Sequence, residues 1–306
     1  MNLEASHYRA RVLKKLRSFF ESRGVLEVET PLLSPSCGID RYIDVFETHR
    51  GQDPHRETLY LQTSPELYMK RMLCHDYPSI YQICKAFRLE EKGPLHHPEF
   101  TILEWYQLGY DYHALIQEVA EVCQLVLGSC QVNKLSYRDA FQKYLGLDPL
   151  DTSVKLLKSK VENRGVGECP FFERTDILNF AISEIIQPRL PQGELTFIVN
   201  YPLEQACLAK RDEEDKQVAN RFEAFFNGIE LCNGFQELAD PVENRKRFLE
   251  EKELRKEAGQ PELVIDELFL KDLEKGLPSC SGVAVGLDRL LMLGFGGKDL
   301  KSVGVG

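Results

Sequence analysis

The chain has 306 residues, 43% of them hydrophobic, and a formal net charge of −10. This length and composition suit a globular protein with one large core or two smaller ones, and they argue against disorder. The acidic charge repels polyphosphates. Because no long run of lysine and arginine supplies a basic patch, it also argues against a tRNA or DNA partner.

No apolar stretch approaches the roughly 18–20 residues that a membrane span requires. The charged, amphipathic N-terminus lacks the apolar core of a signal peptide. We therefore expect a cytoplasmic protein with no membrane partner. The nine cysteines include no C-x-x-C pair, so we expect reduced thiols, most of them in the core, rather than a zinc or disulfide framework.

Apolar periodicity and capping residues predict helices and strands along most of the chain. Helices are expected over 6–23, 66–75 and 111–127, from Ser136 onward, and over 176–187 and 241–258. Strands are expected over 25–30, 79–90, 98–109, 195–200, 219–226, 229–236 and 281–286. Residues 151–175 show no clear period and are expected to form a loop-rich connection. Strands separated by helices, with antiparallel hairpins, predict an α+β (α/β) single domain on a mostly antiparallel sheet.

The predicted hairpin of 79–90 and 98–109 has a polar floor. Period-two geometry places Phe100, Glu104 and Tyr106 on one face of its second strand, while Arg88 ends the first strand. Such a floor could stack a base on Phe100, hold a phosphate with Arg88 and accept an ammonium at Glu104 or Tyr106. An amphipathic hairpin whose charges face water is the commoner explanation of such a pattern.

A second group of acids lies on the hairpin around Asn227-Gly228. Asn-Gly favours a two-residue type I′ turn, which would pair Phe226 with Ile229, Phe225 with Glu230, and Glu223 with Cys232. Glu223 and Glu230 would then be diagonal neighbours on one face and could share Mg²⁺. Taken alone, surface acids are the simpler reading of this pair. Glu237 differs, because its apolar neighbours would make its burial costly without a cationic partner.

A third segment, SGVAVGLDRLLML (281–293), reads as an apolar strand that enters a helix carrying Arg289 in its first turn. A helix N-terminus attracts phosphate. A buried strand-turn-helix that pairs Asp288 with Arg289 is a plausible alternative for this segment alone.

Taken together, these segments resemble the three motifs of class II aminoacyl-tRNA synthetases. Residues 9–33, with VLEVETPLL, resemble motif 1; 79–109, with FRLEE and EFTILEWY, resemble motif 2; and 281–295 resembles motif 3. TSPELYMKR, HHPEFT and RFEAFFNGIELCNGFQEL narrow the resemblance to the lysyl-tRNA synthetase branch. The resemblance implies a single catalytic domain over 1–306, with an antiparallel sheet flanked by helices.

Lysyl-tRNA synthetases carry an N-terminal OB-fold that reads the anticodon, and no room for it is expected before residue 9. A stand-alone catalytic body with Ala284, where the synthetases have a third motif 3 glycine, is similar to the elongation factor P lysyltransferase family, the PoxA, GenX or EpmA proteins. Its members activate (R)-β-lysine with ATP and transfer it to a lysine side chain of elongation factor P. The resemblance also implies a homodimer, because motif 1 forms a two-fold interface in this class.

The resemblance assigns roles to individual residues. Arg88 and Arg289 would be catalytic, and Mg²⁺ would be held by Glu223 and Glu230. ATP would contact Arg88, Leu89, Glu90, His96, His97, Phe100, Glu230, Leu231, Gly286 and Arg289. The amino acid would contact Ser64, Pro65, Glu66, Tyr106, Asn233, Glu237 and Ala284, with the ε-ammonium at Glu237 and Tyr106 and the other amino group at Ser64 and Glu66.

The expected chemistry requires no side-chain nucleophile, because positioning and electrostatics suffice for attack of a carboxylate on the α-phosphorus. The Ala284 methyl should crowd an α-amine and favour an amine displaced by one carbon. Two other functions stay open: a truncated lysyl-tRNA synthetase-like enzyme that charges tRNA, and a catalytically silent paralogue that acts as a binding subunit.

Overall fold

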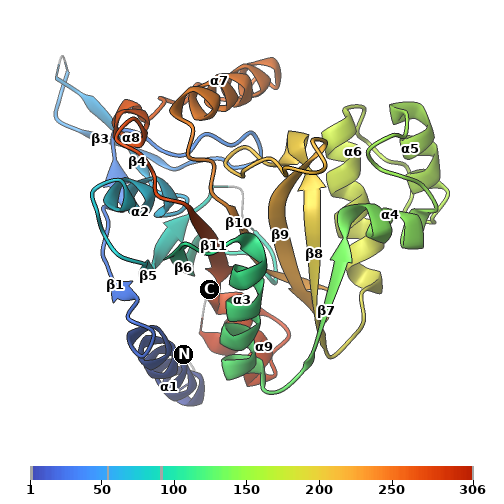
Figure 1. Cartoon of the computed structure of the whole chain (residues 1–306), viewed down its shortest axis with the longest axis horizontal. Coiled ribbons are helices and arrows are strands. Elements are labelled where there is room, and N and C mark those ends of the chain that lie inside the picture. Colours follow the sequence, from blue (N-terminus) through green and yellow to red (C-terminus); the bar gives the residue numbers. More distant parts are fainter. Residues whose placement is uncertain (1–2, 54, 90–91, 305–306) are drawn as a thin grey trace. The chain divides into compact units, whose positions relative to one another are not determined.

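The computed structural model describes residues 3–53, 55–89 and 92–304. The chain divides into two compact units, unit 1 (Met1–Gly128 with Glu237–Gly306) and unit 2 (Ser129–Gln236) (Figure 1). The expectation of a single catalytic domain stays a prediction. No helix in the described ranges is both long and apolar enough to span a bilayer.

Unit 1 is built on four strands that are hydrogen-bonded in the order β1 (Leu26–Glu27), β5 (Ile80–Phe87), β6 (Glu99–Leu108) and β11 (Cys280–Gly286). β1 pairs in parallel with β5, and the other neighbours are antiparallel. A second sheet has the order β2 (Leu33–Ser34), β4 (Glu57–Leu61) and β3 (Glu47–Arg50).

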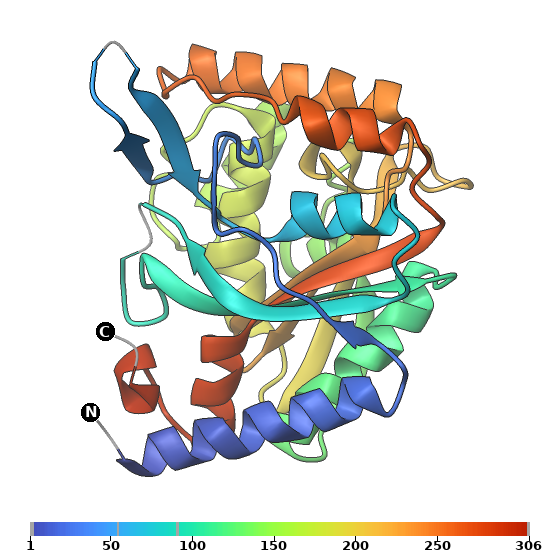
Figure 2. The same ribbon diagram turned by 90° about the vertical axis from the view of Figure 1, so that its left-hand side faces the viewer.

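The helices of unit 1 cover both faces of the β5-β6-β11 sheet. They are α1 (Leu3–Glu21), α2 (Glu66–Leu73), α3 (Tyr112–Leu127), α7 (Pro241–Glu257), α8 (Glu267–Leu273) and α9 (Leu287–Phe295), followed by the 3-10 turn η4 (Leu300–Val303). α1, α3 and α9 contact one another, and Figure 2 shows α1 lying beside α9. Trp105 of β6 faces this layer, where its indole donates to Glu118 of α3 and its ring lies 5.3 Å from that of Phe20 of α1.

Unit 2 also has four strands, in the order β10 (Ile229–Gln236), β9 (Val218–Phe226), β8 (Glu194–Pro202) and β7 (Gln131–Ser136). β10-β9 and β9-β8 are antiparallel, whereas β8-β7 is parallel. The helical elements are α4 (Tyr137–Leu145), α5 (Val154–Glu162), α6 (Arg174–Ala181), the π-helical turn η1 (Ile182–Ile186), and the 3-10 turns η2 (Gln187–Arg189) and η3 (Leu203–Gln205). Their apolar faces form a continuous core with β8 and β9, centred on Phe141, Ile177, Ile198 and Phe225.

Most predicted elements are confirmed, and both units have a mainly antiparallel sheet flanked by helices. The hairpin of β5 and β6 pairs Ile80 with Tyr106 and Phe87 with Glu99. The expected cap at Ser136 is also present, since its hydroxyl accepts the Asp139 N–H at 3.0 Å. The cysteines are free thiols, and most of them are buried.

Two expectations about the elements are wrong. The segment 151–175 contains α5, which Ser153 caps, because Leu157 and Val161 at i and i+4 are fully buried and suffice to fix a short charged helix. The strand expected over 25–30 is reduced to β1, since only Leu26 and Glu27 pair with β5. The alternation of apolar and polar residues therefore predicted a longer strand than the pairing with β5 supports.

Candidate functional site

One face of the sheet in unit 1 gathers the polar residues of β6 and β11. Directly opposed residues share a face, and the register pairs Tyr106 with Gly282 and Glu104 with Ala284. The Ala284 methyl group therefore lies on the same side of the sheet as the Glu104 carboxylate. This is the face opposite Trp105, which confirms the period-two prediction that Glu104 and Tyr106 line one floor.

On this face two acids pair with a buried ammonium and a third acid lies nearby, and we call Glu66, Glu104, Glu237 and Lys70 the carboxylate cluster. Lys70 Nζ lies 2.6 Å from Glu66 Oε1 and 2.5 Å from Glu237 Oε2, with only 1% of the lysine side chain exposed. Glu104 accepts hydrogen bonds from Ser64 Oγ at 2.8 Å and from the Tyr106 hydroxyl at 2.6 Å. The expected cationic partner of Glu237 is thus a lysine of α2.

Ser64 and Glu66 reach the cluster through the start of α2. The Ser64 hydroxyl accepts the Glu66 N–H at 3.0 Å while it donates to Glu104. Pro65 takes the N-cap position itself, without a side-chain cap. One turn later, the i, i+4 spacing places Lys70 against Glu66. The structure therefore brings together Ser64, Glu66, Tyr106 and Glu237, the residues assigned to the amino groups by resemblance.

The cluster fits closely against Gly282. A Cβ atom at this position would lie 2.5 Å from both Glu237 Oε1 and Tyr106 Cδ1. Real Cβ atoms do not approach other atoms so closely, so the phenol ring and the carboxylate occupy the space that a side chain would need. Glycine at 282 is thus a requirement for the position of Glu237 and Tyr106.

Burial governs the protonation of the cluster. It raises the pKa of Glu237 to about 8, against the opposing effect of the Lys70 ammonium. It raises the pKa of Glu104 to about 7, with a further increase from the Glu66 charge. Burial lowers the pKa of Lys70, but the charges of Glu237 and Glu66 outweigh it, and the net pKa is raised. With its pKa raised and ion pairs to both Glu66 and Glu237, Lys70 is charged.

The arginines of the second and third sequence motifs converge on the turn between β5 and β6. The Arg88 guanidinium lies over the Phe100 ring, 5.1 Å from its centroid. Arg289 Nε donates to the Leu95 carbonyl at 3.1 Å. Arg88 and Arg289 are far apart in the sequence, but both contact residues between Leu95 and Phe100 of unit 1. In this structure Phe100 is covered by Arg88, whereas the resemblance placed an adenine between Phe100 and Arg289.

The neighbouring motif 2 residues are held by backbone contacts. The Leu89 N–H donates to the Asp44 carbonyl at 2.9 Å, and the His96 N–H to the Gly93 carbonyl at 3.3 Å. His97 Nδ1 lies 2.8 Å from the Glu99 carbonyl oxygen. Glu90, which was assigned to adenine, lies outside the described residues.

Asp288 links all three motifs within unit 1. Its carboxylate accepts from Arg9 of α1 at 2.6 Å and from the backbone N–H of Thr101 of β6 at 2.6 Å. Arg9 also donates to the Thr101 hydroxyl at 2.6 Å. Asp288 therefore anchors the start of α9 beside Phe100. The alternative considered for this segment, a pair of Asp288 with Arg289, does not account for the contacts of Asp288 with Arg9 and Thr101.

The β9–β10 hairpin of unit 2 carries the second group of acids. Asn227 and Gly228 both have positive φ, as a type I′ turn requires, and Phe225 opposes Glu230 as predicted. The predicted partner of Glu223 is wrong: a bulge at Leu231 places it opposite Asn233 instead of Cys232. The bulge inserts one extra residue and shifts the following register by one.

Side chains of the protein already bind the Glu223 carboxylate. It accepts from the Tyr201 hydroxyl at 2.6 Å and from Arg221 at 2.5 Å, and Arg221 also donates to Asn233 Oδ1 at 3.0 Å. Burial raises the pKa of Glu223 to about 7, and the like charge of Glu230 adds to that increase. A divalent cation would relieve this repulsion, so the chemistry of the pair fits the expected metal, although no cluster of three or more ligating side chains occurs among the described residues.

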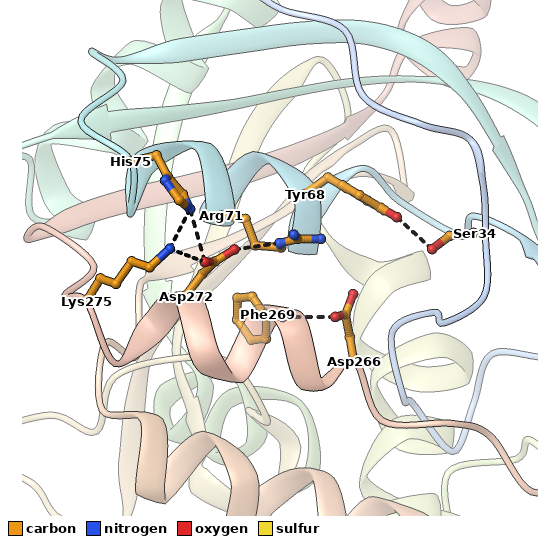
Figure 3. A network of polar contacts seen from close by, with 8 residues as sticks. All are labelled: Ser34, Tyr68, Arg71, His75, Asp266, Phe269, Asp272 and Lys275. Atoms are coloured by element: carbon orange, nitrogen blue, oxygen red, sulfur yellow. Dashed lines mark hydrogen bonds and ion pairs between the residues drawn. The ribbon is translucent and has the colours of Figure 1, made fainter.

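A polar network ties α2 to α8 (Figure 3). Asp272 of α8 accepts from Arg71 Nε at 2.8 Å and from Lys275 Nζ at 2.7 Å, and lies 3.0 Å from His75 Nε2. Burial disfavours the ionised Asp272, but these three hydrogen bonds outweigh it and hold its pKa well below the usual range. Arg71 follows Lys70 directly, so this network anchors the helix that presents Lys70.

Sequence reasoning missed Lys70, Arg221 and Asp272. For Lys70 a signal was present, because Glu66 and Lys70 have the i, i+4 spacing of a helical ion pair. The partners of Arg221 and Asp272 are set by strand register and helix packing, which a single sequence does not display.

Comparisons with known proteins agree with these motifs. The sequence model of the family described as tRNA synthetases class II (D, K and N) matches residues 3–305. A protein of Histophilus somni named elongation factor P–(R)-beta-lysine ligase is 41% identical over 298 residues, covering 96% of this chain and 92% of the relative. Proteins of the same name from Vibrio cholerae (42% over 292 residues, 94% and 90%) and Klebsiella pneumoniae (41% over 300 residues, 96% and 92%) are similar to the same extent.

Proposed function

This chain belongs to the class II tRNA synthetase (D, K and N) family, and from that membership we propose that it is a ligase that activates (R)-β-lysine with ATP and transfers it to a lysine side chain of elongation factor P. The relatives that cover nearly the whole chain carry a name that joins these two substrates. We further propose that it acts as a homodimer and without tRNA.

The observation that carries the proposal is the carboxylate cluster. Lys70 forms ion pairs with Glu66 and Glu237, and the two buried acids of the cluster, Glu104 and Glu237, have raised pKa values. Such a cluster favours a ligand that brings ammonium groups, because these would replace the protons that the acids otherwise hold. A diamino acid has that chemistry, whereas a neutral or acidic amino acid would leave the carboxylates unpaired.

The first step forms an acyl-adenylate. A carboxylate oxygen of the amino acid attacks the α-phosphorus of ATP, an O–P bond forms, and the bond to the β-phosphate oxygen breaks to release pyrophosphate. Arg88 would hold the substrate carboxylate and the α-phosphate, and Arg289 would meet charge on the γ-phosphate. Asp288 keeps the start of α9 against β6, which orients Arg289 toward the motif 2 turn. Mg²⁺ held by Glu223 and Glu230 would neutralise phosphate charge.

The second step transfers the acyl group. The ε-amine of the acceptor lysine attacks the carbonyl carbon of the adenylate, a C–N bond forms, the C–O bond to AMP breaks, and the amine loses a proton. No side chain of this chain acts as a nucleophile. Its contribution is to bind, orient and exclude water.

ATP–pyrophosphate exchange with purified protein tests the proposal. We expect exchange that depends on a lysine, is stronger with β-lysine than with α-lysine, and leads to elongation factor P that gains the mass of one lysyl group. Exchange followed by labelling of tRNA instead would identify a tRNA-charging enzyme. Absence of exchange with either diamino acid would indicate a silent paralogue and would refute the proposal.

A further inference from the structure

We propose that Lys70 is a specificity-determining residue: a resident ammonium that sets the charge of the carboxylate cluster so that it is balanced by an amino acid carrying two ammonium groups. The inference rests on the proposed function and extends it, because Lys70 lies within the TSPELYMKR segment but is not among the residues to which the resemblance assigns a contact.

The geometry makes Lys70 part of the cluster rather than of the surface. Its Nζ contacts both Glu66 and Glu237, the acids assigned to the two amino groups of the substrate, at 2.6 and 2.5 Å. Its side chain is 1% exposed, as is that of Glu237. Lys70 thus ties the two acids to one point and fixes the spacing between them, which is the spacing that a diamino acid must match.

Charge balance then identifies the substrate class. Glu66, Glu104 and Glu237 carry three negative charges when ionised, and Lys70 supplies one positive charge. Two negative charges are left for a ligand, which equals the two ammonium groups of a diamino acid. A monoamino acid would supply only one of these positive charges, so one acid would have to keep its proton or stay as a costly buried charge.

The protonation of the cluster is consistent with this count. Two acids, Glu104 and Glu237, have pKa values raised to about 7 and about 8, so at neutral pH they retain protons that two incoming ammonium groups would displace. The Lys70 charge lowers the pKa of both acids. Other titratable groups that interact with the cluster are the Tyr106 phenol and the thiols of Cys74, Cys84 and Cys280, all with pKa values raised chiefly by burial and therefore neutral.

Removal of Lys70 should therefore change the binding of the amino acid in a specific way. In Lys70→Gln the acids lose their counter-charge, their pKa values rise further, and they ionise only at higher pH. We expect the KM for the diamino acid at pH 7 to rise at least about tenfold, as loss of one partner of a buried charge pair requires. We expect the pH at which this KM reaches its low plateau to move upward by about one pH unit or more, while the KM for ATP stays unchanged.

Arg71→Gln is the matched control. Arg71 is the next residue of α2 and also has a buried carboxylate partner, but that partner is Asp272, outside the cluster. It should lower the stability of α2 without moving the pH profile. If Lys70 were only a structural ion pair, Lys70→Gln would behave like Arg71→Gln, and that result would overturn the inference.

Lys70→Arg covers the case in which Lys70→Gln does not fold. The guanidinium keeps the charge but not the compact geometry, so the pH profile should stay in place while the KM for the diamino acid alone rises. Equal increases in the KM values for ATP and for the amino acid would contradict the inference. The wild-type protein separates the proposed function from the role of Lys70. If it shows no pyrophosphate exchange that depends on a diamino acid, the proposed function fails. If its exchange is normal but the pH dependence of the KM is unshifted in Lys70→Gln, only the role of Lys70 is refuted.

Discussion

Replacement of Gly282 by alanine should disable amino acid binding more than any other single added methyl group on this sheet. The new Cβ would lie 2.5 Å from Glu237 Oε1 and from Tyr106 Cδ1. An ordinary van der Waals contact of a Cβ begins near 3.4 Å, so each of the two side chains must retreat by about 1 Å. Tyr106 and Glu237 are both buried, at 2% and 5% exposure, so neither has open space into which it can move.

A displacement of this size has a predictable cost. A misplacement of about 1 Å at a reacting or binding group reduces activity by about a hundredfold, and overpacking a core costs about 1–3 kcal/mol of stability. We expect Gly282→Ala to raise the KM for the diamino acid by about two orders of magnitude with little change in the KM for ATP. Diamino acid-dependent pyrophosphate exchange, measured at saturating ATP and then at saturating amino acid, separates the two constants.

Gly294→Ala provides the matched control. Its Cβ would also collide with packed atoms, since it would lie 2.7 Å from the Val126 carbonyl oxygen, but it is in α9 at the contact with α3. It should lower the melting temperature by a similar amount and leave the KM for the amino acid unchanged. If both variants changed this KM equally, or if Gly282→Ala bound the amino acid normally, the close fit of the cluster would not be what positions the substrate.

Three further outcomes are expected. Ala284→Gly should raise kcat/KM for α-lysine by about tenfold, since one methyl group discriminates by about 1–3 kcal/mol; unchanged α-lysine-dependent exchange would refute this. Asp272→Ala should lower the free energy of unfolding by about 2 kcal/mol. Because its folded-state pKa is depressed, that difference should be complete above about pH 5 and shrink progressively as the pH falls below about 4 toward the depressed folded-state pKa in denaturant titrations; a constant difference would contradict the assignment. Glu104 and Glu237 hold protons in the folded state up to pKa values of about 7 and about 8, so without substrate the free energy of unfolding should fall as the pH rises from about 5 to 8. The double variant Glu104→Gln/Glu237→Gln should flatten this dependence of the free energy of unfolding on pH. An unaltered dependence would show that other groups cause it.

Local signals in the sequence were sufficient wherever short-range geometry decides the structure. The Asn227-Gly228 turn, the Ser136 cap and the alternation of Glu104 and Tyr106 each depend on residues a few positions apart, and each was predicted correctly. The motif resemblance likewise anticipated the family and named Ser64, Glu66, Tyr106 and Glu237, which meet at the carboxylate cluster, because it draws on the order and spacing of motifs along the chain.

Tertiary structure alone decided the partners of the charges. Nothing local indicates that Lys70 of α2 meets Glu237, which lies 167 positions further along the chain, or that Asp288 joins Arg9 to Thr101. The bulge at Leu231 and the burial that raises the pKa values of Glu104 and Glu237 are similarly invisible in one sequence. Sequence periodicity specifies which face of an element a residue occupies, but the residue that it faces, and the dielectric around it, depend on which elements pack together.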